Sequence, residues 1–538
     1  MRSPSRRLVA SVLATCLTLG LSAISTAPAA NAASSSDTGL FGSGDPTYDG
    51  VIRQSLALMA YAADGVAPPP ESVTWLLKQQ CPDGGFQSYR ANTSTACLPG
   101  NWTNAIGEDT NSTGLAAAAL AALGKTTEAT SARDWLRPLQ SPTDGGFPWF
   151  PGKDANGDSP SDANSTAFAL LATNAVNILP ADVMAPGSTK TAVDYLSSVQ
   201  IACTSTSADG AFAYADYGTG LSANDTASVQ AVLALTGHSL TDVMSTSVQN
   251  DNPFVCNGNV PGPFDPVAGG AVYLHSVLDT NSNAIPLLDF STGLYTAGSV
   301  EPADTATAVL ALASAGVDPS TLQESLTIVG QKSAAAPDNP ALKAMYALAL
   351  HATGASDSVI HPVLAQITAT LKPHNSSAPK ISGAINAGST VSCSAGTWTQ
   401  NPTLKYKWVR SGSTATIATT PTLKITTAMV GKRLTCTITA TRGHAVTTVS
   451  TSTLANTVRP ISIGAKTVGT LLTAKVGSWS PAPTSYRYVW KLGSVVVGTA
   501  ATYRVKAQDR GGRLRLYVTA YRTGYSPTTV FSMYRTIV

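Results

Sequence analysis

A short pattern occurs three times along this chain of 538 residues. In each copy an aromatic residue precedes Leu, a Gln lies five positions after the aromatic residue, and Asp-Gly, a small residue and Phe come soon after. The Gln residues are Gln80, Gln140 and Gln200, which are sixty positions apart, and fainter copies end at Gln249 and Gln331. A fixed period predicts units that stack on one another, because one small unit cannot bury its own apolar face.

An apolar run follows the repeated pattern and begins at Ser, Thr or Asp. The runs are NSTGLAAAALAALG, NSTAFALLATNAV, DTASVQAVLALTG and DTATAVLALASAG. They are rich in Ala and Leu on every side, which is typical of a buried helix, whereas TTEATSARDWLRPLQ is polar on one face and predicts an outer helix. We therefore expect helical hairpins joined by Asp-Gly turns, in which Asp bonds its own backbone and Gly adopts a positive φ.

The segments QQCPDGGF and LQSPTDGGFPW, together with the apolar runs, resemble the prenyltransferase and squalene-oxidase repeat. That repeat builds the α/α-toroid of terpenoid cyclases and protein prenyltransferases, and the resemblance covers residues 46–372. It implies parallel inner helices around an axis, an outer ring antiparallel to them, and staples between neighbouring hairpins made by Gln80, Gln140 and Gln200. The Trp that often closes the family motif is Phe or absent here.

The catalytic motifs of that family do not carry over to this chain. It has no Asp-x-Asp-Asp run for protonating a substrate, no Asp-Asp-x-x-Asp run for diphosphate-bound metal, and DNPFVC has the wrong spacing for the prenyltransferase zinc site. Four histidines occur singly, with no partner pattern in the sequence: His238, His275, His351 and His361. We expect no catalytic residue from the family, no metal and no cofactor.

Parallel inner helices would gather their N-termini at one mouth. Short acids and hydroxyls at a helix start are good caps, and capping alone accounts for them. Alternatively, these groups and the aromatic residues of the adjoining loops form a ligand mouth suited to a glycan or another polar ligand with an apolar face. A glycosidase with paired carboxylates would also fit, but the sequence selects no pair. The candidate residues are Asp109, Asn111, Asp162, Asn164, Asp225, Asp304, Trp102, Trp149 and Tyr214.

The N-terminal 32 residues predict a secretory signal peptide, with Arg2, Arg6 and Arg7 before an apolar stretch and Ala30-Asn31-Ala32 at its end. The apolar stretch is too short to span a bilayer. Six cysteines remain after cleavage, and an even number in an exported protein predicts disulfides. The sequence does not fix their connectivity, but locality within the repeats favours Cys81–Cys97, Cys203–Cys256 and Cys393–Cys436.

Charge divides the chain sharply. Residues 33–377 contain 11 Lys and Arg against 30 Asp and Glu, a net charge of −19. Residues 378–538 contain 20 Lys and Arg against one acid, Asp509, a net charge of +19. Such asymmetry indicates a domain boundary and an anionic partner for the basic part, either a wall polymer or glycan or the acidic half of the same chain.

The basic part is an internal duplication with an offset of about 81 residues. Alternating Val, Thr, Leu and Tyr with frequent turn signals predict two small β-sandwiches, which resemble the Ig-like modules of secreted actinobacterial proteins. Cys393 and Cys436 are replaced together by Ala474 and Leu516 in the second copy, as expected of bonded partners. Trp408 and Trp490 occupy the positions of the core tryptophan in such modules.

The sequence thus predicts a multidomain chain, an α/α-toroid of helical hairpins plus two small Ig-like β-sandwiches. The expected parts are a signal peptide (1–32), a flexible linker (33–45), the toroid (46–372), a linker (373–379) and Ig-like modules (380–457 and 458–538). We expect a secreted, envelope-associated binding protein with no transmembrane segment and no nucleic-acid partner. The alternatives are a terpene-cyclase-like or glycan-active enzyme and a small-molecule, cobalamin-like carrier.

Overall fold

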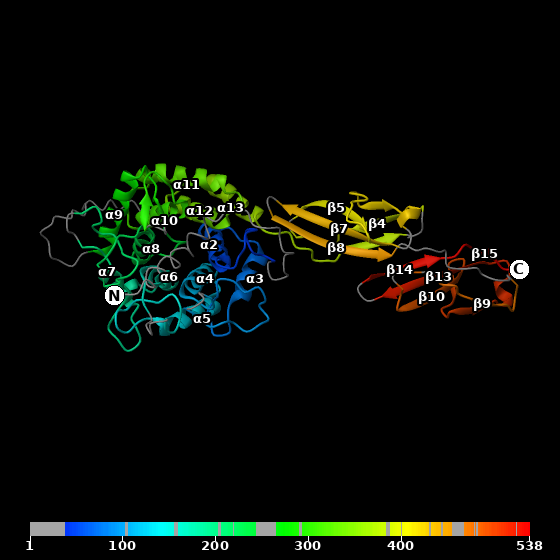
Figure 1. Ribbon diagram of the computed structural model, residues 1–538. Coiled ribbons are helices and arrows are strands. Elements are labelled where there is room, and N and C mark those ends of the chain that lie inside the picture. The colour runs from blue at the N-terminus through cyan, green and yellow to red at the C-terminus, as the bar shows by residue number, and fades with distance from the viewer. Residues whose placement is uncertain are drawn as a thin grey trace. The chain divides into compact units, whose positions relative to one another are not determined.

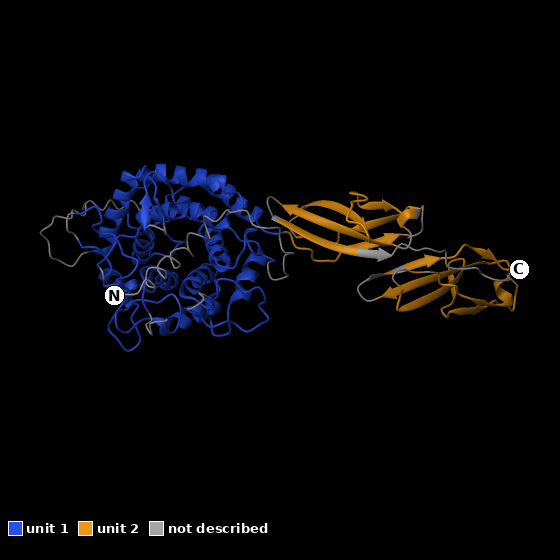
Figure 2. Cartoon of the chain, viewed as in Figure 1, with its two compact units in different colours: residues 1–372, 443–445 blue, residues 373–442, 446–538 orange. Residues whose placement is uncertain are grey.

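The computed structural model describes residues 38–538 except for 103–105, 155–159, 203–205, 219, 244–264, 290–292, 384–387, 400, 430–431, 443–444, 455–466, 478, 480–481 and 523–524. The chain divides into two compact units, residues 1–372 with 443–445 and residues 373–442 with 446–538 (Figure 2). The predicted signal peptide, the faint repeat at Gln249 and both cysteines of the predicted Cys203–Cys256 pair lie outside the described residues.

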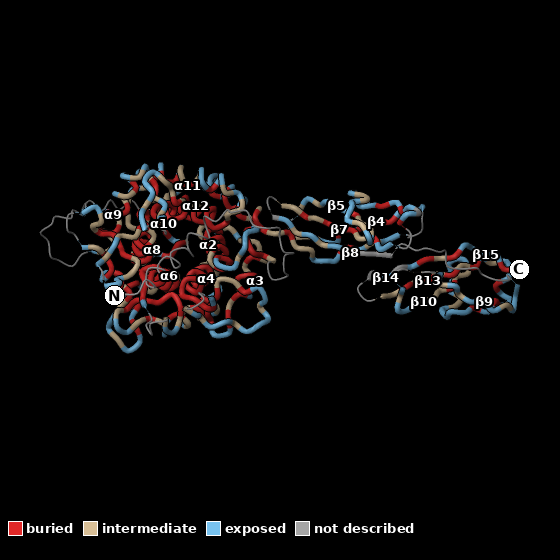
Figure 3. Tube along the Cα trace, viewed as in Figure 1, coloured by how far each residue is buried: buried red, intermediate tan, exposed pale blue. Residues whose placement is uncertain are grey.

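Two kinds of helix alternate along the described part of the first unit. The inner helices are buried over most of their surface (Figure 3), and they are α2 (Gly50–Ala63), α4 (Thr110–Ala122), α6 (Ala163–Asn174), α8 (Asp225–Leu235), α10 (Pro302–Ser314) and α12 (Pro340–Ala352). The outer helices are α3 (Pro70–Gln79), α5 (Thr126–Leu136), α7 (Ala192–Ser198), α9 (Pro266–Thr280), α11 (Gln323–Ala335) and α13 (Asp357–Ala369). Smaller elements are 3-10 turns at Arg137–Leu139, Pro180–Asp182 and Pro319–Leu322 and a hairpin of β1 (Leu287–Asp289) and β2 (Leu294–Thr296).

Residue composition explains this alternation. Every residue of α6 is buried, as its Ala- and Leu-rich sequence predicts. The outer helix α5 buries Ala129, Ala132 and Leu136, which recur at helical spacing on one face, and its other residues contact solvent to differing degrees. The buried and half-exposed patterns that the sequence predicts for the two kinds of helix are therefore present in the fold.

The inner helices pack in a cyclic order. Each contacts the next along the chain, from α2 through α4, α6, α8 and α10 to α12, and α12 also packs against α2 (Figure 1). Asn111 and Asn164 bond to each other near the starts of α4 and α6, and Thr236 bonds to Ser314 where α8 and α10 end. The N-termini of α4 and α6 therefore lie side by side, as do the C-termini of α8 and α10, so each of these two pairs of neighbouring inner helices runs parallel.

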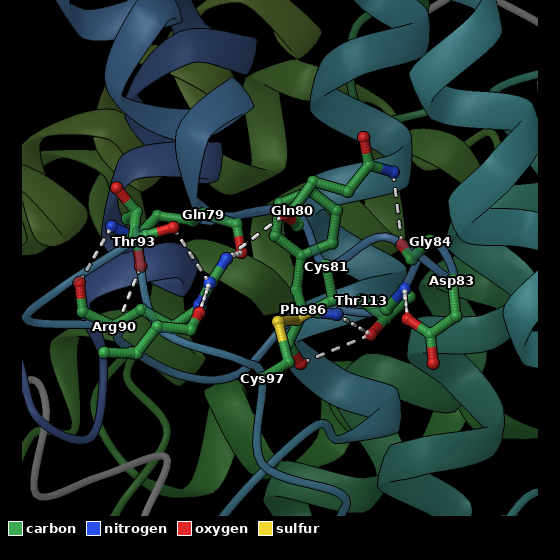
Figure 4. Close-up of a disulfide and its surroundings, with 12 residues drawn as sticks. Gln79, Gln80, Cys81, Asp83, Gly84, Phe86, Arg90, Thr93, Cys97 and Thr113 are labelled. Atoms are coloured by element: carbon green, nitrogen blue, oxygen red, sulfur yellow. Dashed lines mark hydrogen bonds between the residues drawn. A yellow bond between two sulfur atoms is a disulfide. The ribbon is translucent and has the colours of Figure 1, made fainter.

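The repeated Gln and Asp-Gly pattern forms a joint between hairpins. Gln140 Nε2 donates to the carbonyl of Gly145 at 2.8 Å and at 2.9 Å to that of Val183, which also accepts from the N–H of Ala192, the first residue of the next outer helix. The backbone N–H of Phe147 donates to Thr166 Oγ1 on the following inner helix at 2.9 Å. Each joint thus ties one hairpin to the next, as the resemblance implies for these Gln residues. The same bonds recur in two further joints, one made by Gln80, Gly84, Phe86 and Thr113 (Figure 4) with Glu128 as the second acceptor, the other by Gln200, Gly210, Pro266, Phe212 and Ser228.

Two further joints share this geometry without sharing the sequence pattern. At the first, Gly39 has a φ of 93° and the N–H of Phe41 donates to Gln54 Oε1 at 3.0 Å. At the second, Asn283 adopts a φ of 62° and the N–H of Ile285 donates to Thr305 Oγ1 at 3.0 Å. Neither joint follows from the repeated pattern, because Asn replaces Gly in one and the Asp-Gly pair is absent from each.

The second unit contains two β modules that correspond to the duplicated sequence. The first module has one sheet of β3 (Lys380–Gly383), β4 (Thr390–Ser394) and β6 (Thr422–Lys424), and another of β5 (Thr403–Arg410), β7 (Arg433–Arg442) and β8 (Ala445–Leu454). The second pairs β9 (Leu471–Thr473) with β12 (Thr502–Arg504), beside a sheet of β10 (Ser485–Leu492), β11 (Val495–Gly498), β13 (Arg513–Arg522), β14 (Tyr525–Phe531) and β15 (Arg535–Thr536). Short 3-10 turns occur at Thr427–Met429 and Ala507–Asp509.

The cores of the two modules are built alike. Trp408 lies opposite Cys436 in the β5–β7 register, and Trp490 lies opposite Leu516 in the β10–β13 register. Both tryptophans are wholly buried. Since Cys393 is on β4 and Cys436 on β7, their disulfide joins the two sheets of the first module.

Two of the three disulfides favoured by locality are present, Cys81–Cys97 and Cys393–Cys436. Among the described residues, no helix has both the length and the apolar character needed to cross a bilayer.

Candidate functional site

The predicted mouth residues of α4 and α6 act first as helix caps. Asp109 Oδ1 accepts from the N–H of Ser112 at 2.8 Å, and Asp162 Oδ1 accepts from the N–H of Ser165 at 2.7 Å. Their second oxygens accept from the hydroxyls of the same serines. Desolvation outweighs these bonds, so burial raises the pKa of Asp109 to about 6 and that of Asp162 to about 7.

The two other predicted acids differ from these caps. Asp225 follows the cap residue of α8, and its carboxylate accepts from the hydroxyl of Tyr273. Asp304 lies in the first turn of α10 and accepts from Thr226 Oγ1. Burial raises the pKa of each carboxyl to about 6, and the charge of Asp225 adds to the shift at Asp304. Two interacting carboxyls thus lie near the starts of neighbouring inner helices.

A line of side-chain amides crosses three inner helices. Asn111 Nδ2 on α4 donates to Asn164 Oδ1 on α6 at 2.9 Å, and Asn164 Nδ2 donates to Gln230 Oε1 on α8. Asn111 Oδ1 is buried and has no hydrogen-bond partner. The structure therefore brings the two predicted asparagines together and adds Gln230, which the sequence analysis misses although a Gln inside an apolar helix is a visible signal.

A cavity of about 730 Å³, open solvent at its mouth included, is lined by all six inner helices. Its walls are mainly apolar, with polar side chains from Asp49, Arg53, Gln230 and Asp304. Asp49 and Arg53 form an ion pair at 3.2 Å, and burial raises the pKa of Asp49. The remaining lining residues are Ile52, Leu56, Leu115, Phe168, Leu171, Leu233, Leu240, Ala303, Thr307, Ala341 and Met345.

Of the predicted mouth residues, Asp304 alone is among those lining this cavity. The predicted aromatic residues pack within the loop layer instead. Trp149 is 8 % exposed and its ring centroid lies 4.3 Å from that of Phe150, which Trp102 meets edge-on at 5.8 Å. Tyr214 bonds to Asp162, and burial holds the pKa of its phenol well above the usual value. These aromatic side chains therefore support the loops that carry the caps.

Glu108, which precedes the cap Asp109, is a further buried acid. Burial raises its pKa to about 8, and the neighbouring carboxyl of Asp83 adds to the shift. The first repeat thus has an acid in its Asp-Gly turn, Asp83, and another just before the following inner helix, Glu108, and neither lines the cavity.

The second β module presents a face rich in both cations and aromatic rings, which we call the basic-aromatic face: Lys491, Arg513, Arg515, Tyr517, Phe531 and Tyr534. The Arg515 guanidinium lies 3.7 Å from the ring centroid of Tyr534 and 4.6 Å from that of Phe531. Arg513 lies 4.6 Å from the centroid of Tyr534, and Lys491 lies 5.2 Å from that of Tyr517. Lys491 and Arg515 are directly opposite in the β10–β13 register, and like charges so placed repel each other.

Acidic groups do not offset this charge within the basic part of the chain. Asp509 is the only Asp or Glu in residues 378–538, and it is 1 % exposed. Its carboxylate accepts from the Tyr503 hydroxyl at 2.6 Å and from the Lys506 N–H at 2.8 Å. The positive side chains of the β modules therefore have no surface carboxylate side chain of their own modules to neutralise them.

No protein-family model matches this chain, and a search of curated proteins found no match to it.

Proposed function

We propose that this chain is an exported binding protein of the cell envelope, with an α/α-toroid in the first unit and two Ig-like modules in the second. The cyclic order of the inner helices, their parallel neighbours and the alternation with outer helices support the toroid. Two sheets around a buried tryptophan in each module, and the inter-sheet disulfide of the first, support the Ig-like assignment.

The observation that carries this proposal is the net charge of +19 on residues 378–538, with their single acid buried. A positive surface that carries no exposed acidic side chain of its own attracts polyanions through a long-range field. On the basic-aromatic face, stacked rings hold the guanidinium groups of Arg513 and Arg515 in place and limit the side-chain freedom that binding would remove. A bound anion would also relieve the repulsion between Lys491 and Arg515. The ligand that this face fits is an anionic envelope polymer such as a teichoic acid.

We expect the full-length protein to bind an anionic resin and the triple variant Lys491→Gln, Arg513→Gln, Arg515→Gln to elute at clearly lower salt. A matched control removes three exposed positive charges from the first module, as Lys405→Gln, Lys407→Gln, Lys424→Gln. Salt gradients on teichoic acid and heparin resins compare the three proteins, because salt screens charges over about 10 Å at 0.1 M. If both variants elute at the same lowered salt concentration, retention depends on the total positive charge and not on the basic-aromatic face. Failure of the parent protein to bind would refute the proposal.

A second candidate function, acid–base catalysis in the first unit, is favoured by Asp225 and Asp304. Their pKa values of about 6 lie close to neutral pH, where a proton donor or acceptor works best, and Asp304 reaches the cavity. Two carboxyls lie close together here, so a cationic ligand or a reaction that develops positive charge would be stabilised beside them.

For this second candidate we expect Asp304→Asn to lower turnover by about a hundredfold or more, the usual effect of losing a positioned acid or base. The control is Asp109→Asn, which removes a buried acid away from the cavity and retains a good helix cap. Product analysis by mass spectrometry, with panels of linear isoprenoids and glycosides, measures the effect. If the parent protein turns over neither panel, or if both variants lose activity equally, the catalytic candidate fails.

A further inference from the structure

Three side chains with metal-binding atoms meet where the first inner helix ends and the last outer helix begins. Asp64 is the C-cap residue of α2, and Asp357 and His361 lie four residues apart in α13. The ligand atoms of all three lie within 4.8 Å of one another. Positions four residues apart share one face of a helix, so Asp357 and His361 point the same way toward Asp64. The sequence does not reveal this group, because Asp64 is nearly three hundred residues from the other two.

Asp64 is in an unusual position for an acid. Its side chain is 4 % exposed, and its Oδ2 is buried without a hydrogen-bond partner. It also lies at the C-terminal end of α2, where the helix dipole is negative and disfavours another negative charge. A buried carboxylate in this position is costly unless a cation neutralises it.

His361 provides the nearest group. Its Nε2 lies 2.9 Å from Asp64 Oδ2, but this contact does not have hydrogen-bond geometry. Two ligand atoms of one tetrahedral metal ion lie roughly 3.3–3.6 Å apart, because each is about 2.0–2.2 Å from the ion, so a small outward shift of the half-exposed imidazole would let both atoms bind one ion. Even a protonated His361 would leave the group with a net negative charge, since Asp357 is the second carboxylate. A bound divalent cation would therefore neutralise the two carboxylates better than the imidazolium of His361 can.

We propose that Asp64, Asp357 and His361 form a binding site for a divalent transition metal ion, with Zn²⁺ as the best fit. One imidazole nitrogen with carboxylate oxygens suits zinc, whereas calcium and magnesium prefer sites made of oxygen alone. His361 is half exposed, so an ion can enter from solvent, and water would complete the coordination.

The bound ion would link α13 to α2, the last outer helix to the first inner helix. The same two helices are already joined by the Tyr61 hydroxyl, which donates to the Leu364 carbonyl at 2.7 Å. The proposed metal site thus strengthens the contact that joins the end of the helical unit to its beginning. It is independent of the cavity and of the basic-aromatic face, so it stands whether or not the proposed function is correct.

The test is equilibrium dialysis of the tag-free full-length protein against Zn²⁺, with metal content measured by mass spectrometry. We expect one zinc ion per chain at this site, and His361→Gln to weaken that binding at least tenfold. His275→Gln is the matched control, because His275 Nδ1 lies 3.1 Å from Asp279 in another exposed i,i+4 pair, and no third potential ligand accompanies that pair among the residues that the structure describes. We expect this control to bind zinc as the parent protein does.

Melting curves give a second measurement. Zinc should raise the melting temperature of the parent protein and of His275→Gln, EDTA should reverse the rise, and His361→Gln should not respond. Without metal, His361→Gln should melt close to the parent protein, which shows that the variant is folded. Equal zinc binding by the parent protein and His361→Gln would place the ion elsewhere. No binding by the parent protein would leave an Asp–His ion pair only. Either result overturns the proposal.

Discussion

Acidification from pH 8 to pH 5 is expected to stabilise the helical unit and to raise its melting temperature by about 5 °C or more. Among the described residues of this unit, burial raises the pKa of Asp49 and of five further carboxyls, to about 6 for three of the five, about 7 for Asp162 and about 8 for Glu108. In the unfolded chain such groups titrate near pH 4. The three with pKa values of about 6 are Asp109, Asp225 and Asp304.

The direction follows from the protons bound in each state. Between pH 5 and pH 8 the unfolded chain has these carboxyls ionised, while the folded chain keeps part of them protonated. The folded state binds more protons, so the free energy of unfolding falls as the pH rises through each folded-state pKa. A carboxyl with a folded-state pKa of about 6 contributes on the order of 1 kcal/mol across this range. Glu108 contributes less than its shift suggests, because its surroundings shield it only partly from water.

Scanning calorimetry of the full-length protein at pH 5, 6, 7 and 8 measures the effect. The β modules provide an internal control, since residues 378–538 contain a single acid and their transition lacks a comparable set of carboxyls. Asp162→Asn should flatten the pH dependence of the helical transition, because Asn retains the cap to Ser165 without the charge. If the melting temperature of the helical unit rises from pH 5 to pH 8, burial does not keep these carboxyls protonated.

The sequence predicts the local features of the fold well, because they depend on neighbouring residues. The Asp-Gly turn is one such feature, since Gly146 N–H donates to Asp144 Oδ1 at 2.9 Å and Gly145 has a φ of 89°. The alternation of inner and outer helices is another, since composition alone separates α6 from α5. The joint at Asn283 escapes prediction, because a positive φ is a property of the backbone that more than one residue type can adopt.

The cavity could not be predicted in the same way. Its polar lining comes from Asp49, Arg53, Gln230 and Asp304, which lie on three helices far apart in the sequence. An apolar pattern shows that an inner helix is buried, but it does not show which buried residue faces the axis and which faces a neighbouring helix. The predicted mouth residues separate for the same reason, because capping fixes Asp109 and Asp162 at the starts of α4 and α6, while these two helices line the cavity with residues further along them, Leu115, Phe168 and Leu171.

The joints bond neighbouring hairpins together, and Gly145→Ala is expected to destabilise the helical unit by about 3 kcal/mol or more. Two effects add at this position. The φ of 89° disfavours any residue with a Cβ, and a Cβ here would lie 2.0 Å from the carbonyl oxygen of Thr191, the N-cap of α7. Because that oxygen belongs to the backbone, relief requires the start of α7 to move, which would strain the bond from Gln140 to the Val183 carbonyl.

Gly187→Ala separates the two effects, because Gly187 has a φ of 74° but no atom within 4 Å of the added Cβ. It should therefore cost about 1 kcal/mol, the strain of the left-handed backbone alone. Urea unfolding of the parent protein and both variants, followed by circular dichroism of the helices, measures the difference. If the two variants unfold at the same urea concentration, the close approach of Gly145 to Thr191 carries no stability, and the repeated Asp-Gly pattern would need a role outside the fold. The larger loss in Gly145→Ala is the expected result, since five joints place a Gly or Asn with positive φ before the residue that bonds to the next inner helix.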